Sequence, residues 1–200
     1  MTTAFGARGD QVIGTARDTA PDGGVLLDVT DPSSVAAMAA HLGDTPLDLL
    51  ICNAGVYLDK GADLDSGFPA EMWAKSFATN VTGVFSVIQA LLPNVQAAGG
   101  KIAILSSIMG SDARAPGGSY IYRASKAAVL NLGRNLSADL APRGMAVGIY
   151  HPGWVQTDMG GNAANVTPED SARGLVARFD ALSLETTGVF EGYDGVAIPF

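Results

Sequence analysis

Residues 47–55 read Leu-Asp-Leu-Leu-Ile-Cys-Asn-Ala-Gly, and this stretch decides the class of fold. Its first six residues are mostly apolar without alternation, which is typical of a strand buried on both faces of a parallel sheet. The next three suit the ligand-facing end of such a strand, because glycine permits close backbone approach and asparagine permits unusual dihedral angles. A simple turn is the alternative interpretation of these three residues.

Outward from this stretch, short runs rich in Val, Ile and Leu alternate with longer helical stretches, as in βα units that build a parallel sheet. Two helices have clear start signals, Asp31 before Pro32 and Thr167 before Pro168. We therefore expect an α/β, doubly wound, Rossmann-like fold of three layers with a mostly parallel sheet. Further strands are expected at 11–16, 24–28, 101–106, 145–150 and 188–190, and long helices at 69–96 and 120–140.

The composition predicts one domain spanning residues 1–200, with 48% apolar residues. The charge balance, 12 Lys plus Arg against 20 Asp plus Glu, disfavours a nucleic-acid binder, which needs a basic face. No apolar stretch approaches the roughly 18 residues that a membrane span needs, and the first twenty residues carry charges in place of an apolar signal core. The single cysteine, Cys52, cannot form an internal disulfide, so we expect a cytoplasmic protein.

Tyr122 and Lys126 are candidates for proton transfer. They are four residues apart near the start of a predicted helix, so they project from one face and can share a substrate. A neighbouring ammonium favours the phenolate of a tyrosine, which would let the pair pass a proton at neutral pH. The spacing also arises by chance, so the pair needs supporting residues.

Support comes from polar residues at places where a doubly wound sheet meets its ligand. Ser107 follows an expected strand and could polarise a carbonyl, although a turn or helix-cap serine is the simpler interpretation. Asn80 interrupts a long helical pattern and indicates a kink or a site. Pro152 and Gly153 follow another strand and lead through Thr157 into a loop that covers substrate or is a plain surface connection. The two histidines lack companions at metal-ligand spacing, so no metal site is expected.

Taken in order, Asn53-Ala54-Gly55, Asn80, Ser107, Tyr122-x-x-x-Lys126 and Pro152-Gly153 strongly resemble the signature of the short-chain dehydrogenase/reductase family. Segments 117–128, 151–161 and 193–200 are most similar to its C-factor or Sniffer-like subgroup.

The resemblance implies a role for each catalytic candidate. Tyr122 would be the acid/base, Ser107 would hold the substrate oxygen, and Asn80 would help to hold a proton-relay water. Lys126 would bind the nicotinamide ribose and lower the pKa of the tyrosine.

The resemblance also implies a nicotinamide cofactor. Ala16 stands where NAD-preferring members place an acidic residue, and Arg17 follows it, so NADP is expected over NAD. Besides Tyr122 and Lys126, the implied cofactor residues are Arg17, Asp28, Val29, Asn53, Ala54, Gly55, Pro152, Gly153, Val155 and Thr157.

One family element is missing from the sequence. Members begin with a strand and a Thr-Gly-x-x-x-Gly-x-Gly turn that cradles the pyrophosphate, whereas Gly6 and Gly9 have the wrong spacing and follow no strand. Residues 3–8 resemble only the last turns of the helix after that turn, so we expect an N-terminally truncated family domain with weakened cofactor affinity.

The missing strand would lie between 11–16 and 47–52 in the usual strand order. An unfilled gap would leave unpaired backbone groups, each costing about 1 to 3 kcal/mol when buried, so some repair is expected. We expect 11–16 to shift beside 47–52, with a partner chain's strand or an N-terminal extension as alternatives.

Two functions compete at this point. The first is an NADP-dependent oxidoreductase acting on a small carbonyl compound or secondary alcohol. The second is a non-catalytic binding or signalling protein that kept the scaffold. A further explanation of the missing turn is that the given start lies inside a longer reading frame. The resemblance further implies a homodimer or homotetramer that pairs through the two long helices.

Overall fold

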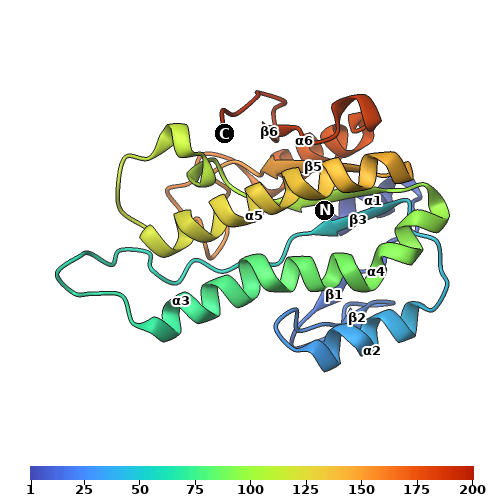
Figure 1. Cartoon of the computed structure of the whole chain (residues 1–200), viewed down its shortest axis with the longest axis horizontal. Helices are drawn as coiled ribbons and strands as arrows, with labels where there is room; N and C mark the ends of the chain where they lie inside the picture. The colour runs from blue at the N-terminus through green and yellow to red at the C-terminus, as the bar shows by residue number, and fades with distance from the viewer.

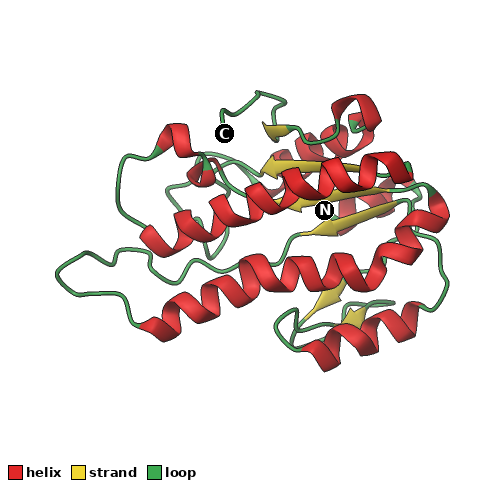
Figure 2. Cartoon of the chain, in the orientation of Figure 1, coloured by secondary structure: helices red, strands yellow, loops and turns green.

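The computed structural model describes residues 1–200, and its elements alternate as βα units do (Figures 1 and 2). The strands are β1 (Thr15–Ala16), β2 (Val25–Leu26), β3 (Leu49–Cys52), β4 (Lys101–Leu105), β5 (Ala146–His151) and β6 (Phe190–Gly192). The helices are α1 (Thr2–Arg8), α2 (Pro32–Leu42), α3 (Ala70–Phe77), α4 (Val84–Ala98), α5 (Tyr120–Leu140) and α6 (Pro168–Ala181), and a π-helical stretch, Ala78–Gly83, joins α3 to α4.

The main sheet has the strand order β3-β4-β5-β6, and all its neighbours are parallel. Successive residues of β4 point to opposite faces. Ile102 and Ile104 pack with α4 and α5, whereas Ala103 and Leu105 pack with α1 and α6. Helices therefore cover both faces, which makes the three layers visible in Figure 1 and confirms the expected α/β Rossmann-like fold.

The two predicted helix starts are confirmed. The Asp31 carboxylate accepts a hydrogen bond from the Ser33 N–H at 2.9 Å, and the Thr167 hydroxyl accepts one from the Asp170 N–H at 3.1 Å. Each satisfies a backbone donor that the first helical turn cannot pair itself.

The expected repair of the sheet by 11–16 is wrong. β1 stays paired with β2 in a separate parallel sheet, with Thr15 opposite Val25, and β3 is left at the end of the main sheet. Gly14 and Ala16 accept hydrogen bonds from β2 and its neighbour Leu27, each 2.9 Å long, so β1 is paired along one edge only. The β1 strand, Thr15–Ala16, is also shorter than the predicted 11–16.

Side chains, not a strand ladder, join the small sheet to the rest. Leu27, Val35 and Met38 pack against Val87 and Leu91 of α4 in one buried cluster. The opposite face of the main sheet receives Phe5 of α1, which packs with α6. The helix predicted from the resemblance of residues 3–8 is therefore present and contributes to the core.

The helical stretch Ala70–Ala98 agrees with the helix expected at 69–96, but it is more apolar than expected. It spans 29 residues, and by length and composition alone it could cross a membrane, contrary to the sequence expectation. In this fold it packs against α2, α5 and β3, as core helices of α/β proteins do.

Candidate active site

The predicted proton-transfer residues lie on the first two turns of α5. Tyr122 is 8% exposed and Lys126 is 4% exposed, and the Lys126 ammonium lies 5.7 Å from the centre of the Tyr122 ring. The Lys126 ammonium donates a 2.9 Å hydrogen bond to the carbonyl of Leu105, the last residue of β4. The pair therefore faces the carboxyl end of the sheet, where ligands of open α/β sheets bind.

Asn80 lies in the π-helical stretch, which explains the interruption of the helical pattern in the sequence. Its side chain is fully buried and bridges two segments. It exchanges two hydrogen bonds with the backbone of Val56, 2.8 and 2.9 Å long, and donates a third, at 2.9 Å, to the Ser125 hydroxyl. The extra residue in a π turn re-aims a side chain, and such turns are frequent at functional sites.

Ser107 is a capping serine, as the simpler of its two predicted interpretations has it. Its hydroxyl caps a short 3₁₀ turn, Ile108–Gly110, by accepting the Met109 N–H at 3.1 Å. The same hydroxyl interacts with the Tyr122 phenol and lowers the pKa of that phenol. Burial has the larger effect and raises the pKa of Tyr122 to about 12. The phenol is therefore protonated at neutral pH, whereas the sequence led us to expect a lowered pKa for Tyr122.

Burial also lowers the pKa of Lys126 to about 8. The ammonium can donate three hydrogen bonds and uses one on Leu105. Gly55 lies directly beside it, since a Cβ atom at Gly55 would come within 3.3 Å of the ammonium and 3.4 Å of the Asn80 side-chain oxygen. The turn after β3 therefore meets both catalytic candidates, and a larger residue would crowd them.

The remaining predicted cofactor residues follow the carboxyl ends of the other strands. Val29 packs against Gly83, where a Cβ atom would come within 2.8 Å of its side chain, so it lies beside the π-helical stretch. Asp28 accepts two hydrogen bonds from Thr30, which lower the pKa of its carboxyl, and the Arg17 guanidinium is near enough to lower it further. The Arg17 side chain is exposed and pairs with Asp18.

The loop after β5 holds the last group of predicted residues. The Pro152 carbonyl accepts a 2.6 Å hydrogen bond from Ser171 of α6. Gly153 has φ 88° and faces the Tyr193 ring, so both its conformation and its surroundings require glycine. Val155 bridges to Val166, and the Thr157 hydroxyl accepts the Gly160 N–H at 3.2 Å. Asn53 and Ala54 lie exposed on the turn after β3.

Sequence reasoning missed two residues that touch this site. Tyr57 stacks on Tyr122, with ring centres 4.2 Å apart and planes 19° apart. Asp59 is 1% exposed and accepts hydrogen bonds from the backbone at the start of α5. No local pattern marks either residue, because their partners lie more than sixty positions away in the chain.

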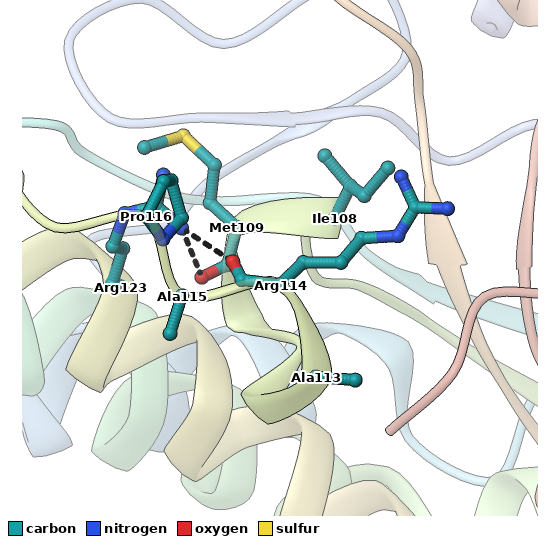
Figure 3. A pocket seen from close by; sticks show the side chains of 7 residues that line it. All are labelled: Ile108, Met109, Ala113, Arg114, Ala115, Pro116 and Arg123. Carbon is teal, nitrogen blue, oxygen red and sulfur yellow. Dashed lines mark hydrogen bonds between the residues drawn. The ribbon is translucent and has the colours of Figure 1, made fainter.

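A hollow of about 540 Å³ lies beside the site and includes none of the predicted catalytic residues. Figure 3 shows Arg123 at one end of it, donating hydrogen bonds to the carbonyls of Met109 and Arg114. No group of three or more His, Cys, Asp or Glu side chains is arranged to hold a metal ion.

Comparison with known proteins places this geometry in context. The family model described as "short chain dehydrogenase" matches residues 10–167. The C-signal of Myxococcus xanthus is 42% identical over 166 residues, which cover 82% of this chain and 99% of that protein.

Solved structures agree over most of the chain. A carbonyl reductase from Pseudomonas aeruginosa PAO1 in complex with NADP has a TM-score of 0.86 and 31% identity, with 100% of this chain and 92% of that chain covered. The carbonyl reductase Sniffer of D. melanogaster has a TM-score of 0.83 and 28% identity, with 88% and 77% covered.

Proposed function

Because this chain belongs to the short-chain dehydrogenase/reductase family of enzymes, we propose that it transfers a hydride between NADP(H) and a small carbonyl compound or secondary alcohol. One observation carries the proposal. Asn80, Ser107 and the α5 pair Tyr122 and Lys126 come from three separate segments and meet at the carboxyl end of one parallel sheet. All four are less than 10% exposed, so their polar groups are held in place by the fold.

Tyr122 is the proposed acid/base. With its pKa raised to about 12, the phenol keeps its proton at neutral pH and can donate it to the oxygen of a carbonyl substrate. The Ser107 hydroxyl, which already interacts with this phenol, is placed to bind the same substrate oxygen. A protonated phenol is the form that donates a proton in the reductive direction.

The residues around Lys126 suit a nicotinamide nucleotide. The ammonium has two unused donors for a ribose diol, and Gly55 leaves room beside it for backbone contact. The bound nicotinamide would supply the hydride. The two nucleoside ends would be held by the remaining predicted cofactor residues, which are Asp28, Val29, Asn53, Ala54, Pro152, Gly153, Val155 and Thr157.

NADP is proposed over NAD because no acidic side chain occupies the end of β1. Ala16 ends that strand and Arg17 follows it, so a guanidinium is available for a 2′-phosphate. Relatives of known structure are described as bound to NADP or NADPH, which supports this choice.

The alternative is a binding or signalling protein with weakened cofactor affinity. It is favoured by the gap between the β1-β2 sheet and β3, and by the sequence similarity to the C-signal. It leaves the four buried site residues without a use.

Fluorescence titration with NADPH separates the two functions, because the enzyme should bind the cofactor below millimolar concentration. Absence of binding at millimolar NADPH would contradict the enzyme proposal. A Tyr122→Phe variant should bind NADPH like the parent but lose carbonyl reduction by about a hundredfold or more, the upper range for removal of a general acid. Parental turnover in this variant would refute the assigned acid.

We also propose that the chain forms a homodimer or homotetramer through α4 and α5. Phe85 on α4 is 40% exposed, although the neighbouring residues Val84 and Val87 are buried. Light scattering coupled to size-exclusion chromatography tests this, and a monomer at all concentrations would contradict it.

A further inference from the structure

The helix that carries Tyr122 does not cap its own first turn. Ser119 occupies the capping position with φ 50° and ψ 43°, in the left-handed region that residues other than glycine rarely adopt. A capping serine normally has an extended backbone, so the Ser119 hydroxyl makes no hydrogen bond to the first turn. The first N–H groups of α5 therefore need another acceptor.

Asp59 supplies that acceptor from the loop after β3. One carboxylate oxygen accepts the Ile121 N–H at 2.8 Å, and the other accepts the Tyr122 N–H at 3.2 Å. The side chain is almost fully buried, and no Lys, Arg or His pairs with it. A buried carboxylate without a cation is costly, so the positive end of α5 is what stabilises it.

The same loop also holds the Tyr122 ring. Tyr57, two residues before Asp59, stacks on that ring at 4.2 Å, and its hydroxyl shares a short hydrogen bond with the Ser119 hydroxyl. The loop thus contacts Tyr122 in two ways: Asp59 binds its backbone N–H, and Tyr57 stacks on its ring. Lys126, one turn later, is anchored separately to the Leu105 carbonyl.

We propose that Asp59 is a positioning residue for the reaction, which fixes Tyr122 relative to Ser107 and Lys126. This inference rests on the proposed function of Tyr122 as the acid. Tyr122 is the third residue of α5, so it lies in the turn that frays when a cap is lost. Fraying moves the phenol while Lys126 and the nucleotide contacts stay in place. Loss of Asp59 should therefore reduce turnover and leave cofactor binding intact.

Three variants of the full chain test this, with NADPH and 4-nitrobenzaldehyde as the probe substrate. Asp59→Ala should lower kcat about ten- to hundredfold, the range associated with a misplacement of about 1 Å, and leave the KM for NADPH within about twofold of the parent. Asp59→Asn should restore most of kcat, because asparagine caps helices about as well as aspartate. Asp31→Ala removes the equivalent cap from α2 and should leave kcat unchanged, which controls for general loss of stability.

Hydrogen exchange gives a readout that does not need activity. The Ile121 and Tyr122 amides should exchange at least about tenfold faster in Asp59→Ala. In Asp59→Asn the Ile121 amide should recover, because the single amide oxygen can replace the carboxylate oxygen that accepts the Ile121 N–H at 2.8 Å and lies 3.4 Å from the Tyr122 nitrogen. Unchanged protection or unchanged kcat in Asp59→Ala would overturn the inference, as would an asparagine variant as slow as the alanine one. Parental turnover in Tyr122→Phe would instead overturn the proposed function, while the exchange result would still decide whether Asp59 holds the helix.

Discussion

A single methyl group at Gly110 tests how tightly the Ser107 turn is seated on α5. Gly110 ends the 3₁₀ turn that Ser107 caps, and it faces the backbone of α5 at Lys126. A Cβ atom there would lie 2.6 Å from the Lys126 carbonyl carbon and 2.7 Å from its oxygen, whereas ordinary contact begins at 3.4 Å. The atoms in the way are backbone, so the turn and the helix must separate by about 0.8 Å.

Gly110→Ala should therefore harm both stability and catalysis. Overpacking of this kind costs about 1 to 3 kcal/mol, which for a protein of this size lowers Tm by about 2 to 12 °C. The same separation moves Ser107 away from Tyr122, so kcat for carbonyl reduction should fall by about tenfold or more.

Gly6→Ala is the matched control. Gly6 lies in α1 with nothing within 4 Å of an added Cβ atom, so alanine should leave Tm unchanged or slightly raised. Differential scanning calorimetry and NADPH consumption measure the two effects. A Gly110→Ala variant that matches Gly6→Ala in both Tm and kcat would refute the close contact between the turn and α5.

Three further predictions follow from buried titratable groups. Burial lowers the pKa of His151 to about 4, so the contribution of the neutral imidazole to stability is complete above pH 6.5 and is lost as the pH falls toward 4. Between pH 7 and 4.5, the free energy of unfolding in urea should therefore fall by about 2 kcal/mol less in His151→Gln than in the parent. Burial lowers the pKa of Lys126 to about 8, so the unfolded chain binds more protons than the folded chain between pH 8 and 10.5. The free energy of unfolding of the parent should therefore rise by about 2 kcal/mol relative to that of Lys126→Met between pH 7.5 and 9.5. A difference between the two proteins that does not change with pH would contradict the burial of the charge. Burial raises the pKa of Cys52 to about 12, so its thiol should not react with Ellman's reagent in the native protein and should react fully in urea. Rapid labelling of the native protein would show that β3 is exposed.

The sequence predicted the elements whose signals are local. The run 47–52 becomes β3, and α5 begins and ends at the expected residues 120 and 140, because burial on both faces and helical periodicity are properties of neighbouring residues. Asn80 is a similar case, since a poor helix former inside a helical pattern marked the π turn.

Features that depend on distant partners could not be predicted. Asp59 is an ordinary loop aspartate until α5 brings the Ile121 N–H to it, and Tyr57 is an ordinary loop tyrosine until it meets Tyr122. The pKa of Tyr122 was misjudged for the same reason, because the spacing to Lys126 was visible in the sequence and the burial was not. The separation of β1 from β3 is also invisible in the sequence, because periodicity does not reveal which strands pair.

The break between β1 and β3 has a consequence for how the protein opens. Residues 15–42 are held to the remainder through the apolar contacts of α2 and β2 with α4, and no strand pairing crosses the break. We therefore expect this segment to unfold at a lower free energy than the main sheet, with its amides losing protection from hydrogen exchange first. Under the proposed function, a dinucleotide that reaches from Arg17 to Lys126 would span the break. Its binding would merge the two units into one cooperative structure, with the ligand in the place of the missing strand ladder.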